Sequence, residues 1–498
     1  MISKIRNSRV FRILFVIVQI LLMYRIVIKL EASVERISNI PRDMLIGEGV
    51  LILFIIYFIN RIDIFKKVYT WIAAVGCALI IFTVLTVKNI HVSTYGPDLY
   101  RAILYTCLVS GCFVTVLTER ICSRSIAGIF KKNGLVIAIF VILSAIALPA
   151  HQISYILIIF PALTLLLTDI KKEKWIELTD CFAVGYYLAF FQLFTHSLIY
   201  NPDRSYLGRF LGSFSQIETG GMFCGGAVVC VIYLWLRFKG EFGKEWIGTI
   251  LAVILGIYPL YSMVLFSSRS TIIALFILGL FVFVFLHGKG KKQTVVRCIV
   301  SAVILLLLTG GVIGFSYFLG YRYAGVEFEE IPYVFNRILA LTDKEFSSGI
   351  FGDSSILNNI DMALSGRLSG WYNSLAQIRL AGHPFEETPI ILELTITTAH
   401  NFFIMWLINY GFIGGTVYII WFLAEFLLMT YAAVKKKDYV LFSVLWIYYC
   451  LGNFMFSCIT WRYVVGFILL LVQYPLIWVI QDLREGNNKK KKRELTEE

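Results

Sequence analysis

Charged residues are scarce in this chain: they make up 15% of its 498 residues, whereas hydrophobic residues make up 58%. Soluble globular domains carry about 25% charged residues, so this composition excludes an ordinary soluble fold. The mean hydropathy is strongly positive, and apolar stretches of about twenty residues, each long enough to cross a hydrocarbon core of about 30 Å, recur along the chain. Because lipid offers the backbone no hydrogen-bond partners, these stretches are expected to be helical.

Cysteine pairs are also missing: the ten cysteines stand singly in apolar segments, with no CxxC spacing, so neither a disulfide framework nor a cysteine metal site is expected. No outward Asp-x-Asp pair occurs, so no metal-held sugar nucleotide is indicated, and we expect no metal and no cofactor. The basic residues are not interleaved with aromatic ones as in an RNA-binding patch. A nucleic-acid partner is therefore not expected.

Fourteen apolar runs are candidate membrane-spanning helices, and closely abutting runs leave a range of 12 to 14. The first run follows a basic segment like that of a signal peptide, but no small-residue cleavage site follows it, so we expect an uncleaved anchor. The runs cover roughly residues 10–29, 45–60, 68–87, 98–117, 134–150, 152–168, 177–200, 219–236, 246–266, 270–286, 298–318, 400–434, 439–457 and 463–481.

The basic residues predict the orientation, because short loops rich in Lys and Arg stay in the cytoplasm. With the N-terminus inside, alternate loops hold most of the 45 basic residues, so both termini are expected to be cytoplasmic. The net charge of +13 is then mainly a topology signal that also attracts anionic membrane lipids. The inward clusters include Arg120 to Lys132, Lys171 to Lys174, Lys289 to Arg297, Lys435 to Lys437 and Lys489 to Arg493.

One predicted outward segment is far longer than the other loops and contains enough large apolar residues to form a folded helical cap. Within it, Asn358 to Leu380 is predicted to be a helix, because Leu368, Trp371, Leu375 and their neighbours recur at helical spacing. This apolar stripe is expected to lie against the membrane bundle. The expected parts are an N-terminal bundle of about 11 helices (1–318), the cap (319–398), the C-terminal helices (399–481) and a basic cytoplasmic tail (482–498).

Arginine predominates over lysine on the predicted outer side, where Lys344 is the only lysine of the cap. A guanidinium presents a planar fork that binds phosphate oxygens in bidentate fashion, so this choice indicates a phosphate-bearing ligand outside the membrane. Alternatively, these arginines extend to lipid headgroups or pair with nearby glutamates. Arg269 is wedged between two apolar runs, where a charge is costly and usually functional. The outward arginines are Arg204, Arg209, Arg269, Arg322, Arg337, Arg367, Arg379 and Arg462.

His400 lies at the start of a long apolar run. Thr397 or Thr398 can cap the helix that begins there, and the positive end of the helix dipole then favours a neutral imidazole, which can act as a base. A helix from 400 to 434 would be about 52 Å long, well beyond the membrane core. It must tilt, kink near Gly411 and the glycines that follow, or project above the bilayer, and each option puts His400 at the outer interface. The alternative is a structural or capping histidine.

Two glutamates lie in apolar runs near these positions. Glu218 opens a span near the predicted outer face, and Glu425 sits within the run that follows His400. Both could pair with arginine. We interpret Glu218 as a candidate site residue and Glu425 as structural.

Four patches of the chain carry a family resemblance. They are Gly208 to Phe214 with Gly220; Ser267-Ser268-Arg269; Ser365-Gly366-Arg367 with Trp371 and His383-Pro384; and Ala399-His400-Asn401 with Tyr410-Gly411 and Gly414. Together they resemble the O-antigen polymerase and ligase family of bacterial surface-polysaccharide assembly, and the last patch is the most specific. The chain departs from the family in having Ser215 to Glu218 where an Asn-Pro-Asn-like turn is common, and Phe385 to Thr388 where a glycine pair is common.

The resemblance implies an all-α, polytopic, GT-C-like glycosyltransferase of the bacterial plasma (inner) membrane with an extracytoplasmic active site. It implies that Arg209, Arg269 and Arg367 bind the pyrophosphate of an undecaprenyl-linked oligosaccharide, that His400 is the base, and that Asn401 orients the acceptor or the sugar. Donor and acceptor are both lipid-linked, and a flippase and a chain-length regulator of the same pathway are expected partners. Further expected substrate-binding residues are Arg204, Arg322, Glu218, Trp371 and Tyr410.

The same signature fits more than one activity. We favour polymerisation of repeat units into a capsular, exopolysaccharide or O-antigen chain, because the outward segments contain no extra acceptor-binding domain. Ligase-type transfer of the glycan to a lipid or protein acceptor is the first alternative. A lipid-linked oligosaccharide flippase or another transporter is the second, and it predicts arginines spread through the membrane and no large cap over one face.

Overall fold

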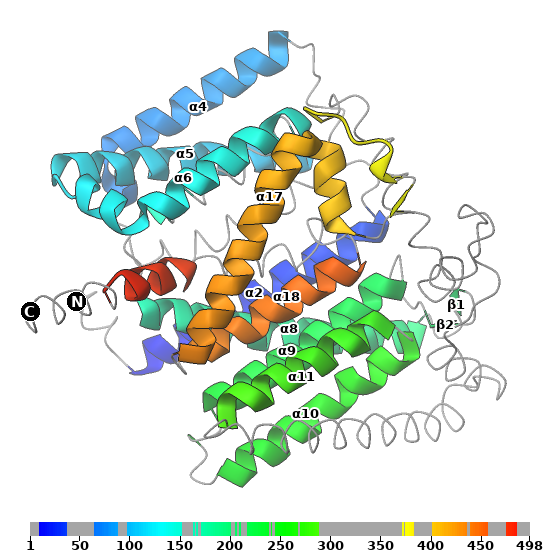
Figure 1. Ribbon diagram of the computed structural model, residues 1–498. Helices are drawn as coiled ribbons and strands as arrows, with labels where there is room; N and C mark the ends of the chain where they lie inside the picture. Colours follow the sequence, from blue (N-terminus) through cyan, green and yellow to red (C-terminus); the bar gives the residue numbers. More distant parts are fainter. Residues whose placement is uncertain are drawn as a thin grey trace, which may run out of the picture. The chain divides into compact units, whose positions relative to one another are not determined.

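The described part of the chain is helical almost throughout (Figure 1). One short hairpin departs from this: β1 (Ser205–Tyr206) pairs with β2 (Arg209–Phe210) in antiparallel fashion, with Tyr206 opposite Arg209. The computed structural model describes residues 9–36, 64–87, 97–151, 163–164, 166–167, 171–200, 205–206, 209–210, 217–238, 241, 245–266, 269–287, 371–372, 374–382, 401–435, 439–456 and 475–485.

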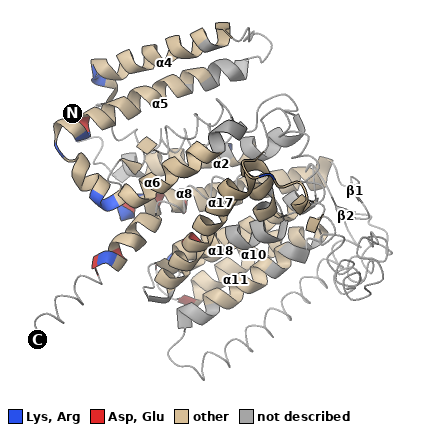
Figure 2. Cartoon of the chain, turned by 45° about the horizontal axis from the view of Figure 1, so that its top comes forward, with Lys and Arg blue, Asp and Glu red and all other residues tan. Residues whose placement is uncertain are grey.

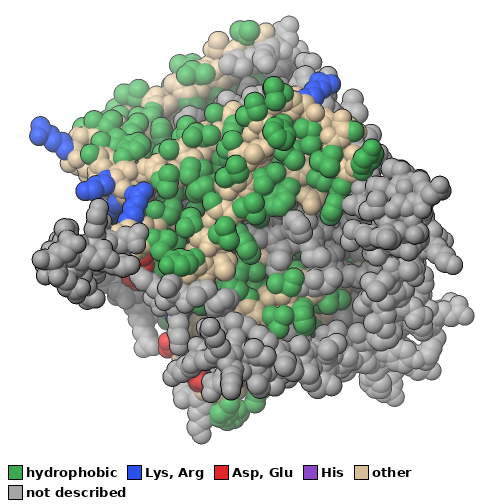
Figure 3. All heavy atoms as spheres, in the orientation of Figure 1, with side chains coloured by type: hydrophobic (Ala, Val, Ile, Leu, Met, Phe, Trp, Pro, Cys, Tyr) green, Lys and Arg blue, Asp and Glu red, His purple; other side chains and the backbone are tan. Residues whose placement is uncertain are grey.

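Six helical stretches of the described part are long and apolar enough to cross a membrane: Val68–Val87, Ile126–Ile146, Lys172–Tyr200, Gly220–Phe238, Glu245–Met263 and Trp406–Ala433. Hydrophobic side chains cover much of the described surface that Figure 3 shows, and the charged residues drawn in Figure 2 lie mostly near helix ends. The chain is therefore a multi-pass α-helical membrane protein, as the composition predicts. The helices are α2 (Arg9–Arg36), α4 (Val68–Val87), α5 (Pro97–Cys122), α6 (Ile126–His151), α8 (Lys172–Tyr200), α9 (Ile217–Phe238), α10 (Glu245–Phe266), α11 (Arg269–His287), α17 (Phe402–Lys435) and α18 (Val440–Phe456), and residues 475–485 are also helical.

The predicted spans agree closely with most of these helices. The predicted run 68–87 coincides with α4, and the run 270–286 differs from α11 by one residue at each end. The predicted runs 45–60 and 298–318 lie outside the described residues, as does most of 152–168, so the total of fourteen stays a prediction. The boundaries of the four predicted parts of the chain also stay predictions, and most of the predicted cap lies outside the described residues.

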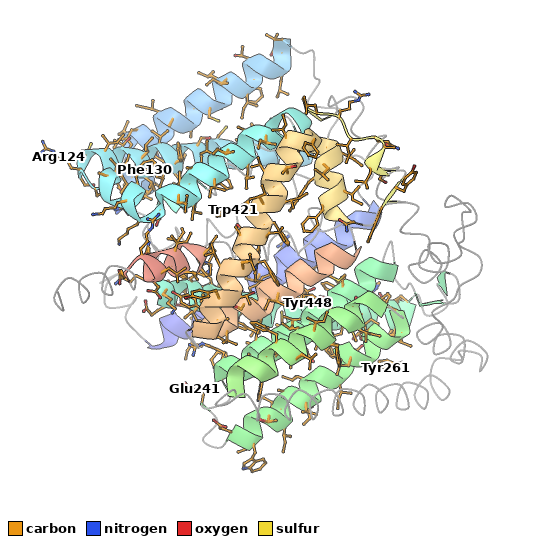
Figure 4. The ribbon with its side chains drawn as sticks, viewed as in Figure 1. Arg124, Phe130, Glu241, Tyr261, Trp421 and Tyr448 are labelled. Atoms are coloured by element: carbon orange, nitrogen blue, oxygen red, sulfur yellow. The ribbon has the colours of Figure 1, made fainter. Side chains whose placement is uncertain are left out.

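The loop predicted between residues 117 and 134 is too long. Helix α5 continues to Cys122 and α6 already starts at Ile126, so Lys131 and Lys132 belong to α6. A helix can extend beyond the hydrocarbon core because water and headgroups solvate its charged side chains there. Between them, Arg124 has a left-handed φ of 51°, and Ser125 N donates to Arg120 O at 3.1 Å, which closes the end of α5. Figure 4 labels Arg124 at this turn.

The described residues form two compact units. The first contains α2, residues 180–200 of α8, the β hairpin, and α9, α10, α11, α17 and α18; the second contains α4, α5, α6, residues 172–179 of α8 and the helical residues 475–485. In the second unit, α4 packs along α5, and Lys67 forms an ion pair with Glu119. Also in that unit, Asn133 donates to Leu166 O at 2.9 Å.

Helix α9 is the centre of the first unit, because α10, α11 and α18 all pack against it. Two tyrosines reach its backbone from neighbouring helices: Tyr448 of α18 donates to Met222 O at 2.8 Å, and Tyr186 of α8 donates to Phe223 O at 3.0 Å. The hydroxyls reach these carbonyls because α9 has glycines at 225 and 226, where a Cβ would collide with the two tyrosines. Figure 4 shows Tyr448 in the region between α18 and α9.

Helix α17 is a hairpin of two helical arms rather than one rod. In a straight helix Trp406 and Tyr418 would lie about 18 Å apart and Phe403 and Phe422 about 28 Å apart, yet their ring centroids are 5.3 and 5.6 Å apart. The chain reverses at Gly411, whose φ of 74° and ψ of 174° are not helical. The first arm (402–410) therefore folds back on the second (412–435), and Figure 1 shows the two parts of α17 meeting at a sharp bend.

Of the options predicted for this run, the hairpin matches a kink near Gly411, and it corrects the predicted span 400–434. Only the second arm, about 36 Å long at 1.5 Å per residue, is long enough to cross a membrane core. The first arm is about 13 Å long and runs back along it. The arms come into direct contact because residue 415 is glycine: a Cβ there would lie 2.6 Å from Leu407 Cα.

Candidate functional site

Asn401 caps the first arm of α17. Its Oδ1 accepts hydrogen bonds from Phe403 N at 2.9 Å and Ile404 N at 3.4 Å, and the side chain is 5% exposed. A residue of this type supplies acceptors for the otherwise unpaired N–H groups of a helical first turn. The sequence predicts capping by Thr397 or Thr398 and a first-turn position for His400. The helix instead begins at Phe402, and position 401 is the cap.

The start of this arm is recessed relative to the bend at Gly411. Phe403 packs on Phe422, which lies nearly half-way along the second arm. Continuing the antiparallel pairing by two residues puts Asn401 at the level of about residue 424, roughly 15 Å from Gly411 along the hairpin. The predicted position of His400 at the outer interface stays a prediction. His400 itself lies outside the described residues.

Helix α11 also begins at a recessed position. Phe266, the last residue of α10, packs over Gly220 of α9, where a Cβ would lie 2.6 Å from Phe266 Cζ. Thr271, in the first turn of α11, is fully buried and contacts Gly225 of α9. Because Arg269 lies between these two contacts, α11 starts about 8 Å inward from the end of α9 at Ile217. The functional role of Arg269 stays a prediction.

The two recessed helix starts lie at similar depth against α18. Tyr448 occupies the space over Gly225, next to Thr271, while Trp446 packs on Phe422 with ring centroids 5.9 Å apart. Residues 446 and 448 are separated by only about 3 Å along the helix axis. Both α11 and α17 pack on α18, so the starts of these two helices lie at the level of the middle of α18.

Two other predicted site residues lie on elements of this unit. Arg209 belongs to β2, which contacts α10, and Glu218 is the second residue of α9. The same end of α9 carries Gly220, the contact point of Phe266. Helices α9 and α11, which carry Glu218 and Arg269, pack on each other, and α10 contacts both α9 and the strand of Arg209.

Trp371 and Tyr410, both predicted to bind substrate, pack within the hairpin region. Trp371 and Ile378 cover Ile404 and Ile408 of the first arm, which confirms in part that the predicted apolar stripe lies against the bundle. Tyr410 is 9% exposed and stacks on Tyr418, with ring centroids 4.7 Å apart. The contacts described for both aromatic residues are therefore with protein side chains.

Residues 378–382, here called the strap, bind the bend of the hairpin. Phe412 N donates to Arg379 O at 2.8 Å, and Ile413 N donates to Leu380 O at 3.3 Å. The predicted helix from Asn358 to Leu380 is thus wrong at its end, because helical structure stops before Ile378. The carbonyls of the strap instead satisfy N–H groups that the bend leaves without helical partners.

Glu425, which the sequence predicts to be structural, is buried in the second arm of the hairpin. It is 3% exposed and accepts a hydrogen bond from Trp421, one turn earlier on the second arm. The pairing of the arms places it near the level of Asn401. Sequence periodicity could not reveal this, because the relation depends on the chain reversal at Gly411. Figure 4 labels Trp421 on this arm.

The remaining predicted site residues are not described. Arg204, Arg322, Arg367 and His400 lie outside the described residues, so their roles stay predictions. For Arg209, Glu218 and Arg269 the structure describes the backbone position.

Helices of membrane-spanning length, one folded into a hairpin, define the class of this chain as a multi-pass α-helical membrane protein. Comparison with protein-family models, with curated proteins and with solved structures finds no match to the chain.

Proposed function

We propose that this protein polymerises undecaprenyl-pyrophosphate-linked oligosaccharide units at the outer face of a bacterial plasma membrane. The proposal rests on the sequence resemblance to O-antigen polymerases and ligases together with one structural observation. That observation is the pair of recessed helix starts at Arg269 and Asn401. The N-terminal end of a helix carries partial positive charge and attracts phosphate groups, and the effect is larger where water is excluded.

The donor diphosphate is the ligand that suits these helix starts. Arg269 opens α11, and Arg209 lies on β2, which contacts α10. In the proposed site these two arginines and Arg367 bind the diphosphate and neutralise the charge that develops on it. Arg204, Arg322 and Glu218 complete the substrate contacts.

The proposed reaction is a single in-line displacement. The acceptor hydroxyl oxygen forms a bond to the anomeric carbon of the donor sugar while the bond from that carbon to the diphosphate oxygen breaks. The hydroxyl proton passes to His400, which acts as general base. The diphosphate leaves on its lipid carrier, and the configuration at the anomeric carbon inverts. The resemblance implies that no metal takes part.

Asn401 has a more specific role in this proposal than orientation of the acceptor alone. Because its Oδ1 holds the first turn of α17, it fixes the start of the arm directly after His400. Its Nδ2 group remains a donor that can contact the sugar. Trp371 and Tyr410 contribute by packing the same arm in place.

Some of these observations are also compatible with two other functions. A ligase that transfers the glycan to a lipid or protein acceptor would use the same donor site. A lipid-linked oligosaccharide transporter is favoured by a separate observation, the re-entrant first arm of α17, because interrupted helices with N-terminal ends inside the membrane are typical of transporter binding sites. A transporter moves the lipid-linked substrate but leaves the number of linked repeat units unchanged.

The direct test is polymer length in cells that carry His400→Ala or Arg269→Lys, with the membrane level of each variant measured in parallel. Loss of a general base typically costs 10²- to 10⁴-fold in rate, so His400→Ala should abolish long chains. Arg269→Lys retains the charge and removes the bidentate geometry, so it should shorten them. The matched control is His196→Ala, which removes a histidine that packs on Tyr200 of α8, ring centroids 4.5 Å apart. Wild-type chain length in His400→Ala would remove this residue from the mechanism.

A further inference from the structure

Helix α8 carries an exposed amide side chain among exposed apolar ones. Gln192 is exposed, and two apolar residues on the same side of the helix, Leu188 and Ile199, are 43% and 63% exposed. Residue 188 is four positions before Gln192 and residue 199 is seven after it, and residues at this spacing share one face of a helix. We refer to these three residues as the Gln192 face.

The other sides of α8 are covered by neighbouring helices. Gly185 meets the backbone of α2, where a Cβ would lie 2.7 Å from a backbone nitrogen. Tyr186 donates a hydrogen bond to a carbonyl of α9, and Tyr187 donates one to a carbonyl of α10. Among the described residues, none forms a hydrogen bond with Gln192. The Gln192 face is therefore the side of α8 that these three helices leave uncovered.

Gln192 lies near the middle of the membrane-spanning part of α8. At one end of this part, Asp180 forms an ion pair with Arg237 of α9, 3.4 Å from Nε to Oδ2. Tyr200 is the last residue of the helix at the other end. At 1.5 Å per residue, Gln192 is about 18 Å from Asp180 and about 12 Å from Tyr200 along the axis. Because these distances together match a hydrocarbon core of about 30 Å, the short side chain of Gln192 cannot extend to the headgroups.

An amide at this depth needs a protein partner. Acyl chains contain neither donors nor acceptors, so an amide surrounded by lipid alone is costly. The carboxamide of Gln192 has two N–H donors and a carbonyl acceptor, so the group that satisfies it must both donate and accept. A second copy of the chain meets this requirement by symmetry. Two copies with the same orientation in a membrane are related by a two-fold axis along the membrane normal, which brings each residue to the level of its own counterpart.

We propose that the protein forms a homodimer through the Gln192 face. The two Gln192 carboxamides join by reciprocal hydrogen bonds, and Leu188 and Ile199 pack around them. Side chains of this kind hydrogen-bond across helices in membranes and hold them together. A different membrane protein would have to present an equivalent group at the same depth, whereas a second copy always does. The proposal does not depend on the glycosyltransferase function.

Cysteine cross-linking measures the predicted contact. Full-length protein with Leu188→Cys, which retains Gln192, is reconstituted in liposomes and oxidised, and the products are separated without reductant and mapped by mass spectrometry. We expect a dimer linked through the two residues at position 188. The matched control is Ile80→Cys in the middle of α4, where the parent side chain is 67% exposed, and it should give no dimer. A bond from position 188 to a cysteine of the same chain, or equal dimer from both variants, would overturn the proposal.

The contribution of the amide is measured by energy transfer between labelled copies in liposomes at a series of protein-to-lipid ratios. Gln192→Leu should raise the dissociation constant of the dimer about tenfold, equivalent to about 1.4 kcal/mol, which is in the range of hydrogen bonds between membrane helices. Gln192→Asn retains an amide and should keep part of the affinity. Equal melting temperatures in detergent would show that both variants fold. Absence of energy transfer in the parent protein at every ratio, or an unchanged constant in Gln192→Leu, would contradict the dimer. The liposomes contain no glycan substrate, so this result is separate from that of the polymerase test.

Discussion

Gly382 and Gly411 contact each other through their backbones, and both have a positive φ, 83° and 74° respectively. A Cβ on Gly382 would lie 2.9 Å from Gly411 N and 2.6 Å from Asn409 O. Side chains other than hydrogen disfavour this backbone region and would also separate the two segments. The contact is what allows the strap to reach the bend of the α17 hairpin.

Gly411→Ala should therefore destabilise the protein. The left-handed φ costs about 1–2 kcal/mol for a residue with a Cβ, and the collision with the strap adds about 1–3 kcal/mol. Thermal unfolding in detergent measures the loss. Gly256→Ala is the matched control, because a Cβ at this position of α10 meets nothing within 4 Å, and it should be neutral or slightly stabilising. Equal melting temperatures for the two variants would contradict the tight bend.

Tyr187 and Pro259 form a second testable pair. Pro259 lies inside α10 and has no N–H to donate to the carbonyl one turn earlier, that of Leu255. Tyr187 of α8 donates its hydroxyl to this carbonyl at 2.8 Å. Tyr187→Phe should cost about 0.6–1.7 kcal/mol, the range for hydrogen bonds between membrane helices. In a Pro259→Ala background the helix supplies its own donor, so the same substitution should cost less. Equal costs in both backgrounds would show that the hydroxyl does not replace the missing donor.

The effect of a substitution at Gly225 of α9 is expected to depend on the hydroxyl of Tyr448. A Cβ at residue 225 would collide with the Tyr448 hydroxyl and would lie 3.1 Å from its Cζ. Gly225→Ala should thus lower the melting temperature, and Tyr448→Phe in the same chain should restore part of it by removing the nearest atom. Tyr448→Phe alone should destabilise slightly, because it removes the hydrogen bond to Met222 O. A double mutant less stable than Gly225→Ala alone would contradict this packing.

The Lys67–Glu119 ion pair is expected to affect how the stability of the second unit falls at high pH. Its hydrogen bond to the Glu119 carboxylate, with a smaller effect of Tyr69, raises the pKa of Lys67 above the ordinary value of 10.5. A raised pKa stabilises the folded state fully below pH 10.5 and loses this effect as the pH rises through the folded value. Lys67→Gln should consequently lower the melting temperature near pH 8 and flatten its fall above about pH 10. Lys66→Gln, at an exposed neighbour, is the matched control and should leave the melting temperature near pH 8 unchanged.

The sequence predicts membrane-spanning helices well because hydrophobicity and length define them locally. The run 68–87 coincides with α4, and the basic residue pattern separates one helix from the next. It does not predict how far α5 and α6 extend toward each other, because Lys131 and Lys132 are compatible with both a loop and a helix end. The β1–β2 hairpin is also too short for a periodic signal.

The hairpin of α17 shows what a local pattern leaves out. Apolar residues continue across Gly411 without a change in spacing, so the sequence suggests one long helix with a kink. The reversal depends on contacts with distant residues: the strap at Arg379 and Leu380, and the close approach of Leu407 to Gly415. The prediction of the site is limited in the same way. Residue types such as Arg269 and Asn401 could be selected from sequence, whereas the depth of their helix starts required the tertiary contacts.

Polymerisation of lipid-linked repeat units, as proposed for this protein, can be measured directly. Purified protein in liposomes is incubated with an undecaprenyl-pyrophosphate-linked oligosaccharide, and the products are separated by length. A polymerase should give a ladder of products that differ by one repeat unit, and His400→Ala should lose this ladder while it retains the fold. Absence of a ladder would contradict the polymerase function, and substrate that crosses the membrane without elongation would favour the transporter alternative.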